Sequence, residues 1–240
     1  MTQGQPGHAL DRNIYVNGEY LARTPAWHVD EAPFKVPQVL KMLAAHRLTP
    51  RTVGDIGCGA GEVLRLLQES LDPACRFWGY DISPQAVAMG QGRANDRLQF
   101  KVADVCDDDH VPFDLVLALD VIEHVPDYFG LLEAIRGKGE LKIFHIPLDL
   151  SVQSVLRRHA LGKRRHLHGH LHYFTRETAL ATLTEVGYEI LDHFFTPHGV
   201  VVAEGTLQKL ARLPRRLGFA LHRELTARIL GGYSLLVLAR

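Results

Sequence analysis

One stretch, residues 53–64, constrains the fold of this chain more than any other part of it. It begins as an apolar run that carries an acid, passes through three closely spaced glycines, and continues with apolar residues at helical spacing. These features are Asp55, the glycines Gly57, Gly59 and Gly61, and the apolar residues Val63, Leu64, Leu66 and Leu67. Their order predicts a strand, a tight turn and a helix that faces a core. Such a turn lets a ligand approach the backbone, and the start of the helix offers it free N–H groups.

The spacing of the glycines argues against a pyrophosphate ligand. A dinucleotide fingerprint requires Gly-x-Gly-x-x-Gly, whereas here the third glycine comes one place early and Glu62 stands where the fingerprint needs glycine. An acid at the start of a helix would repel a phosphate, and Asp55 would favour a cationic group. We therefore expect a ligand with a positive or zwitterionic end. A nicotinamide oxidoreductase remains an alternative, with this broken fingerprint against it.

The motif Asp55-x-Gly57-x-Gly59-x-Gly61 resembles the first motif of class I S-adenosylmethionine-dependent methyltransferases. The resemblance implies that S-adenosylmethionine is the cofactor. It also implies that the glycine loop, Cys58 included, wraps the methionine part of the cofactor, and that Asp55 holds its amino end.

Two later strands of the predicted sheet also end in an acid, as in this family. The first ends at Asp81, and an acid at that strand tip can bind both hydroxyls of a ribose; the resemblance places Ile82 beside it. The second leads to Asp104 and Val105. By resemblance, Asp104 accepts a hydrogen bond from the adenine amino group, and the backbone of Val105 meets the ring.

The stretch 113–127 predicts a central strand with a reactive carboxyl end. Its first part is continuously apolar, as expected of a parallel strand that is buried on both faces, and it then carries Asp120, Glu123 and His124. It resembles the loop that runs beside the transferred methyl group in small-molecule methyltransferases, including the quinone O-methyltransferases. The resemblance places Asp120 at the cofactor and Glu123 at the reaction centre. His124 is a candidate base for an oxygen nucleophile, or it only shapes the loop.

The same residues leave a metal-dependent alternative open. Asp120, Glu123 and His124, completed by a later histidine, resemble the magnesium or manganese site of small-RNA 2′-O-methyltransferases. Further motifs of those enzymes are missing from the sequence. Lys+Arg and Asp+Glu balance at 27 each, which does not indicate a nucleic-acid partner. We therefore assign no metal and expect no nucleic acid.

Four histidines, His166, His168, His170 and His172, alternate along the chain. An extended backbone would place all four on one face. His170 and His172 are predicted to act at the acceptor site, and a polar surface loop is the alternative. The basic run before them, residues 157–165, is either a solvated surface or a site for an anionic substrate such as a phosphate or a uronate.

Strands alternate with helices along the chain, which predicts a doubly wound, mostly parallel α/β sheet. The resemblance specifies a Rossmann-like, seven-stranded sheet with one antiparallel strand and helices on both faces. We expect a single methyltransferase domain over residues 1–240. Its predicted parts are an N-terminal tail and flap (1–35), a core (36–195), an insert (147–174), a helical cap (197–232) and a last strand (233–239).

The predicted function is O-methylation of a small molecule or a glycan-like metabolite with S-adenosylmethionine. A cofactor-binding module without turnover is the alternative outside enzymes. The three cysteines have no metal-type spacing and no obvious pairing, and the sequence shows neither a signal peptide nor a long apolar run. We therefore expect a cytoplasmic protein without a transmembrane segment. The amphipathic helices of the cap are compatible with a subunit contact in a homodimer.

Overall fold

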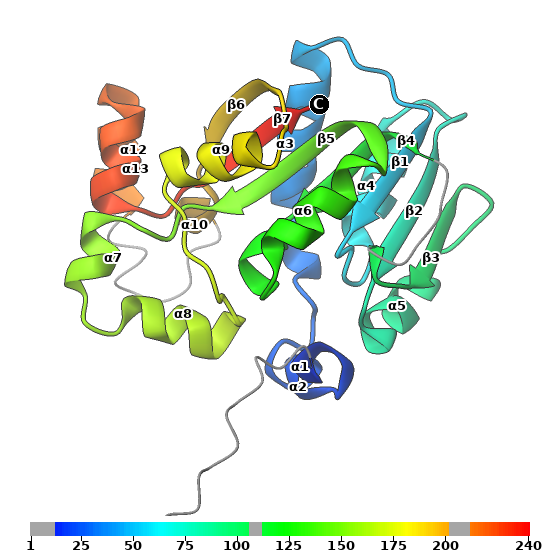
Figure 1. Cartoon of the computed structure of the whole chain (residues 1–240), viewed down its shortest axis with the longest axis horizontal. Helices are drawn as coiled ribbons and strands as arrows, with labels where there is room; N and C mark the ends of the chain where they lie inside the picture. Colours follow the sequence, from blue (N-terminus) through cyan, green and yellow to red (C-terminus); the bar gives the residue numbers. More distant parts are fainter. Residues whose placement is uncertain (1–12, 106–111, 202–211) are drawn as a thin grey trace, which may run out of the picture.

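A computed structural model describes residues 13–105, 112–201 and 212–240 of the protein (Figure 1). Seven strands form one sheet in the order β3-β2-β1-β4-β5-β7-β6, and only β7 is antiparallel to its neighbours. The strands are β1 (Thr52–Ile56), β2 (Arg76–Asp81), β3 (Leu98–Val102), β4 (Phe113–Leu119), β5 (Gly139–Pro147), β6 (Ile190–Thr196) and β7 (Ser234–Ala239). This arrangement confirms the predicted fold class.

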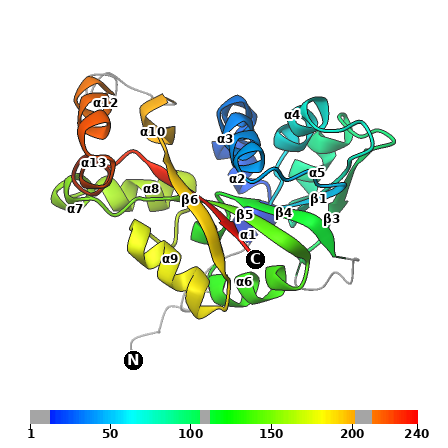
Figure 2. The same ribbon diagram turned by 90° about the horizontal axis from the view of Figure 1, so that it is seen from above.

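Helices cover both faces of the sheet, because its central strands are apolar on both sides. One face packs against α3 (Ala32–Ala45), α4 (Glu62–Ser70) and α5 (Pro84–Gln91), and the other against α6 (Tyr128–Arg136) and α9 (Arg176–Glu185) (Figure 2). Leu64 and Leu67 of α4 are fully buried in the first layer, as the helical spacing after the glycines predicts. The sheet therefore forms the rigid middle layer on which the loops at its carboxyl edge are held.

The remaining helices gather beyond that edge. α7 (Val152–Leu156) and α8 (Ala160–His168) follow β5, and α12 (Arg212–Leu221) and α13 (Arg223–Leu230) precede β7. α13 contacts both α12 and α7, so the insert and the C-terminal helices form one group (Figure 1). Residues 202–211 of the predicted helical cap (197–232) lie outside the described residues. Among the described helices, none has both the length and the apolar composition needed to cross a membrane.

The alternating histidines do not share an extended face, and that expectation was wrong. His166 and His168 lie in α8, which ends at Gly169 with a left-handed backbone (φ 78°). Only His170 and His172 follow in extended chain. A helix with glycine just after its last residue satisfies its terminal carbonyl groups well, and the spacing of the histidines alone could not reveal this turn.

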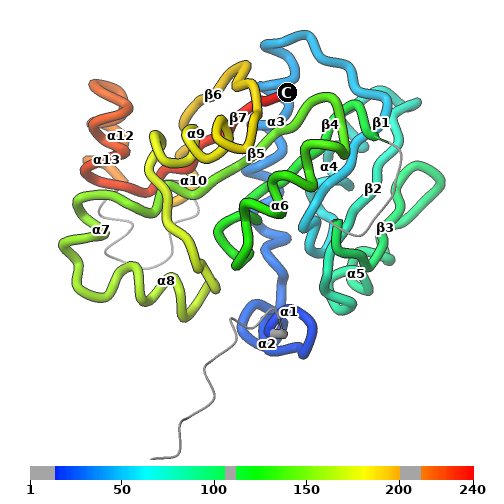
Figure 3. Tube along the Cα trace, viewed as in Figure 1, coloured from blue at the N-terminus to red at the C-terminus, as the bar shows by residue number. Residues whose placement is uncertain are grey.

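Two short helices and a 3-10 turn precede α3. They are α1 (Asn13–Val16), α2 (Glu19–Arg23) and η1 (Val29–Glu31), and they lie between α5 and α8 in the view of Figure 3. Gln85 at the start of α5 donates a hydrogen bond to the Val16 carbonyl (2.8 Å), and Arg23 donates one to the His166 carbonyl of α8 (3.2 Å). The N-terminal segment, residues 13–31, therefore bridges the two sides of the carboxyl edge.

Candidate active site

A cavity of about 1010 Å³ opens at the carboxyl edge of the sheet. All but one of the site residues predicted from the sequence line it. They are Asp55, Gly57, Cys58, Gly59, Gly61, Asp81, Ile82, Asp104, Val105, Asp120, Glu123, His124 and His170. His172 is the exception, since its Nε2 lies 3.0 Å from the Val125 carbonyl oxygen and its ring packs against Tyr128. The structure thus gives His172 a contact within the loop and not a position in the cavity.

The glycine loop is held open by its backbone conformation and by Asp81. Gly57, Gly59 and Gly61 all have positive φ, at 70°, 55° and 78°, a region that other residues enter only with strain. One Asp81 carboxylate oxygen accepts the Gly59 N–H (2.9 Å), and the other accepts the Ser83 N–H (2.8 Å). Asp81 therefore fixes the loop and still presents its remaining lone pairs to the cavity.

Asp55 at the end of β1 is a buried acid with an unused oxygen. Its side chain is 3% exposed, and its Oδ1 has no hydrogen-bond partner among the described residues. Burial raises the pKa of Asp55 to about 8, although Lys35 opposes the shift. A buried acceptor that nothing in the fold satisfies indicates a ligand with a donor, and a cationic amine would also compensate its charge.

Lys35 of α3 forms ion pairs with two further acids that line the cavity. Its Nζ lies 2.7 Å from Asp120 Oδ2 and 3.1 Å from Glu31 Oε2. Burial alone would lower the pKa of Lys35, but these two carboxylates outweigh it and raise the pKa above its usual value. Asp120 also pairs with His145 Nδ1 at 2.6 Å. Both of its oxygens are thus engaged inside the protein, although Asp120 lines the cavity.

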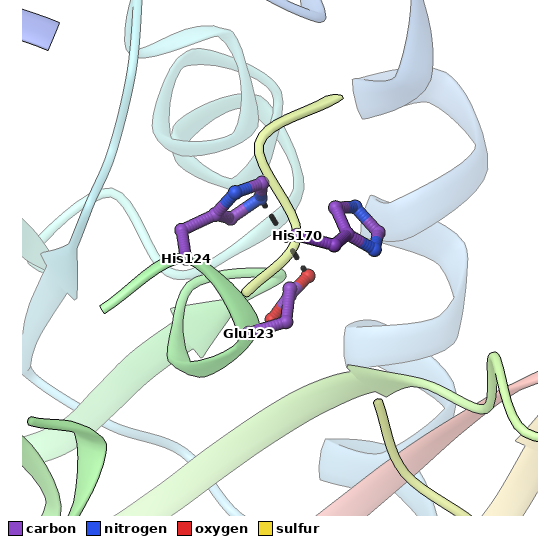
Figure 4. Close-up of side chains that lie close together, drawn as sticks. All are labelled: Glu123, His124 and His170. Carbon is purple, nitrogen blue, oxygen red and sulfur yellow. Dashed lines mark ion pairs between the residues drawn. The ribbon is translucent and has the colours of Figure 1, made fainter. Parts of the chain in front are cut away.

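Glu123 and His124, in the 3-10 turn after β4, come together with His170, which follows α8 (Figure 4). The carbonyl oxygen of Glu123 accepts backbone N–H groups of Leu171 (2.7 Å) and His172 (3.1 Å), which holds the segment after α8 against this turn. Each residue has one ligand atom within 4.8 Å of the other two, and Glu123 Oε1 lies 3.8 Å from His124 Nε2.

The electrostatics of this cluster favour neutral side chains. Glu123 is 1% exposed, and neither of its oxygens has a hydrogen-bond partner among the described residues. Burial and the nearby Asp120 raise the pKa of Glu123 well above its usual range. Burial and His170 lower the pKa of His124 to about 3.

The second nitrogen of each histidine is anchored. Tyr15 of the N-terminal segment places its hydroxyl 3.0 Å from His124 Nδ1, and Asp149 places Oδ2 2.6 Å from His170 Nδ1. Such partners fix the orientation of a ring and direct its Nε2 atom. The cluster can accept a proton from a ligand or hold a cation.

The sequence-based site prediction did not include Tyr15 or Asp149, and it placed Lys35 within the flap (1–35) without a specific role. Asp149 lies just beyond the carboxyl end of β5, where ligands of open α/β sheets bind, so its position was a usable signal. Tyr15 and Lys35 come from the segment before β1, and no strand periodicity connects them to the site. Their roles depend on contacts far apart in the sequence.

A family model described as a methyltransferase domain matches residues 29–193. Among curated proteins, an ajmaline N-methyltransferase of Rauvolfia serpentina is 32% identical over 114 residues, which is 42% of this chain and 38% of that protein. A ubiquinone biosynthesis O-methyltransferase of Idiomarina loihiensis is 30% identical over 126 residues, 47% of this chain and 50% of that protein. The chain thus spans half or less of the length of these relatives.

Solved structures show the same fold at low sequence identity. The magnesium protoporphyrin IX methyltransferase ChlM of Synechocystis PCC 6803, with bound SAH, has a TM-score of 0.58 at 18% identity, covering 99% of this chain and 89% of that one. The N-methyltransferase NodS of Bradyrhizobium japonicum WM9, with S-adenosyl-L-homocysteine, has a TM-score of 0.61 at 19% identity, covering 95% and 98%.

Proposed function

The chain belongs to the methyltransferase domain family, and on that premise we propose that it transfers a methyl group from S-adenosylmethionine to an oxygen of a small molecule or glycan-like metabolite. The membership confirms the resemblance to class I methyltransferases and the prediction of S-adenosylmethionine as the cofactor. The observation that carries the proposal is one cavity shared by the glycine loop, the buried acids and the Glu123–His124–His170 cluster. Nitrogen or carbon as the methylated atom is the alternative.

The cofactor would extend along the ends of three strands. The unpartnered oxygen of Asp55 suits the ammonium of its methionine part. The glycine loop lets the methionine part of the cofactor approach the backbone closely, and Asp81 suits the ribose hydroxyls. Asp104 and Val105, which line the same cavity, would meet the adenine ring.

The reaction needs little from the protein beyond placement, because the sulfonium already activates the methyl group. With the cofactor bound, the new O–CH₃ bond would form as the S–CH₃ bond breaks, and the electron pair of the broken bond would stay on sulfur. The hydroxyl proton would pass to His124 Nε2, which is a weak base in the free protein because burial and His170 lower its pKa to about 3. For this atom to accept it, His124 Nδ1 must carry a hydrogen and donate it to the Tyr15 oxygen at 3.0 Å. Loss of turnover in His124→Ala with cofactor binding intact would support this role, and unchanged turnover would remove it.

The first test is calorimetric titration with S-adenosylhomocysteine, with NADH as a control ligand. We expect micromolar binding, about −8 kcal/mol, to the wild type, and its loss in Asp81→Ala. Glu133→Ala, on an exposed position of α6, is the matched control and should bind like the wild type. Binding of NADH instead, or no binding of either, would overturn the proposal. Cofactor binding without turnover of any acceptor in a broad screen would favour a non-catalytic module.

The unsatisfied carboxylate of Glu123 favours a second candidate, metal-assisted O-methylation. Glu123, His124 and His170 offer one carboxylate and two imidazoles, a donor set that suits several divalent transition metals. A cation held there would lower the pKa of an acceptor hydroxyl, and His124 would then be a ligand and not the proton acceptor. Equilibrium dialysis with Mn²⁺ distinguishes the two: stoichiometric binding that is lost in Glu123→Gln favours the metal, and absence of binding favours His124 as base.

A further inference from the structure

The cavity that holds the Glu123–His124–His170 cluster is also lined by residues of α8 and α12 and of the segment after α7. Four cationic side chains line this part of the cavity, and we call them the basic lobe. They are Arg157, Lys163, Arg164 and Arg215. Arg157 follows α7, Lys163 and Arg164 lie in α8, and Arg215 lies in α12, which is distant in the sequence from the other two helices (Figure 1). Their convergence on one cavity is therefore a property of the fold and not of the basic run in the sequence alone.

Arg215 is the most telling member because it is buried without a counter-charge. It is 8% exposed. Its Nε donates to the Leu230 carbonyl (3.1 Å), and its Nη2 donates to Gln153 Oε1 (3.0 Å). Both acceptors are neutral, and within the described residues no carboxylate lies at ion-pair distance from its guanidinium. A buried charge is costly unless an opposite charge meets it, so an anionic ligand would complete this site.

The acid nearest to the basic lobe does not supply that charge. Asp149 is 4% exposed, and both of its oxygens are occupied: Oδ1 pairs with Arg164 (2.6 Å) and Oδ2 with His170 (2.6 Å). Among the described residues, Asp149 thus forms an ion pair with one member of the basic lobe, Arg164, and with none of the other three. Burial lowers the pKa of Arg215, and the neighbouring charges of Arg164 and Arg157 lower it further.

We propose that the basic lobe binds a carboxylate or phosphate group of the methyl acceptor. The assignment rests on the function proposed above, because it makes the lobe the far end of the acceptor site. Guanidinium groups bind planar or tetrahedral oxyanions through paired hydrogen bonds. An acceptor anchored there by its anion extends its hydroxyl toward His124, since the two ends share one continuous cavity.

The test titrates inorganic phosphate, and in a separate arm acetate, into protein saturated with S-adenosylhomocysteine, at constant ionic strength set with chloride. We expect one of the two anions to bind the wild type, and to bind at least ten-fold more weakly in Arg215→Gln. The matched control is Arg216→Gln, an exposed neighbour on the same helix that does not line the cavity; it should bind like the wild type. The arm that binds tells which oxyanion the lobe accepts.

A second variant keeps the test valid if Arg215→Gln does not fold. Arg157 lines the cavity from an exposed position, so Arg157→Gln should fold normally and still weaken the anion. Binding of neither anion to protein that binds S-adenosylhomocysteine would overturn the proposal and leave the proposed function standing. Equal weakening in Arg216→Gln would also overturn it, because the effect would then be one of general charge. Failure to bind S-adenosylhomocysteine would instead count against the proposed function itself.

Discussion

At the scale of single residues, the site holds polar groups that folding alone does not satisfy. Asp55 and Glu123 are both buried with unpartnered oxygens among the described residues. Such groups lower the stability of the free protein, and a bound ligand that pairs with them removes this penalty. Asp55 and Glu123 could be predicted from the sequence because each lies at the carboxyl end of a readable strand. Tyr15 and Lys35 could not, because only tertiary contacts bring them to the site.

Asp55→Asn should stabilise the free protein in a pH-dependent way. The folded-state pKa of Asp55 is raised to about 8, so its neutral form contributes stability that is complete below pH 4 and is lost as the pH rises toward 8. Asparagine does not titrate. At pH 8 the free energy of unfolding of the variant, measured with urea, should therefore exceed that of the wild type by up to about 1.4 kcal/mol for each unit by which the pKa is raised. At pH 4 the two proteins should have nearly the same free energy of unfolding. The affinity of the variant for S-adenosylhomocysteine should fall. If the variant and the wild type differed in stability by the same amount at both pH values, the raised pKa of Asp55 would be contradicted.

Gly59→Ala tests the conformation of the glycine loop. Gly59 has φ of 55°, and a Cβ atom there would lie 2.6 Å from Trp27 Cδ1. We expect a loss of about 1–2 kcal/mol from backbone strain alone and at least ten-fold weaker binding of S-adenosylhomocysteine, measured by urea unfolding and calorimetry. Gly162→Ala is the control: it lies in α8, has open space around it, and should stabilise the helix by roughly 0.5–1 kcal/mol.

At the scale of elements, the N-terminal segment and α8 decide how the site is closed. The sequence predicted an N-terminal tail and flap (1–35), but not that Tyr15 would contact His124 or that Trp27 would lie against Gly59. Likewise, the alternation of the histidines did not reveal that His166 and His168 lie in a helix, which ends at Gly169 in a left-handed turn. Local pattern predicted strands and their tips well, whereas irregular segments depended on long-range contacts.

Tyr15→Phe should separate turnover from cofactor binding. The change removes the hydroxyl that lies 3.0 Å from His124 Nδ1 and keeps the ring. A neutral hydrogen bond contributes about 0.5–1.5 kcal/mol, so we expect roughly a three- to ten-fold lower kcat once an acceptor is identified, with binding of S-adenosylhomocysteine unchanged. Tyr20→Phe, which loses a hydrogen bond to His28 (2.9 Å), is the control and should retain its kcat. A kcat in Tyr15→Phe equal to that of the wild type would show that the contact does not position His124.

At the scale of the whole molecule, the sequence and the family resemblance predicted a seven-stranded, mostly parallel sheet with one antiparallel strand and helices on both faces, and the structure confirms it. The division into tail, core, insert and cap stays a prediction, and part of the cap lies outside the described residues. The contact of the insert with the C-terminal helices could not be predicted from the sequence, since α7 and α13 are far apart along the chain and meet only in the folded protein.

Cofactor binding should stabilise the whole domain by mass action. S-adenosylhomocysteine at 100 times its Kd adds about 2.7 kcal/mol to the free energy of unfolding, which corresponds to a rise in Tm of roughly 5–11 °C for a chain of this size. Calorimetric scans of the wild type should show this rise, and scans of Asp81→Ala should not. An equal rise in both proteins would mean that the ligand binds away from the glycine loop.

The position of β7 between β5 and β6 also orders events during synthesis. In the described sheet, β6 has hydrogen bonds only to β7, which pairs with β5 on its other side. On the ribosome, β6 emerges before β7 and lacks its native partner strand, while β5 presents an open edge of the kind that associates with other chains. A nascent chain that has reached residue 200 therefore cannot close its own sheet, and a chaperone that shields that edge would act in this interval.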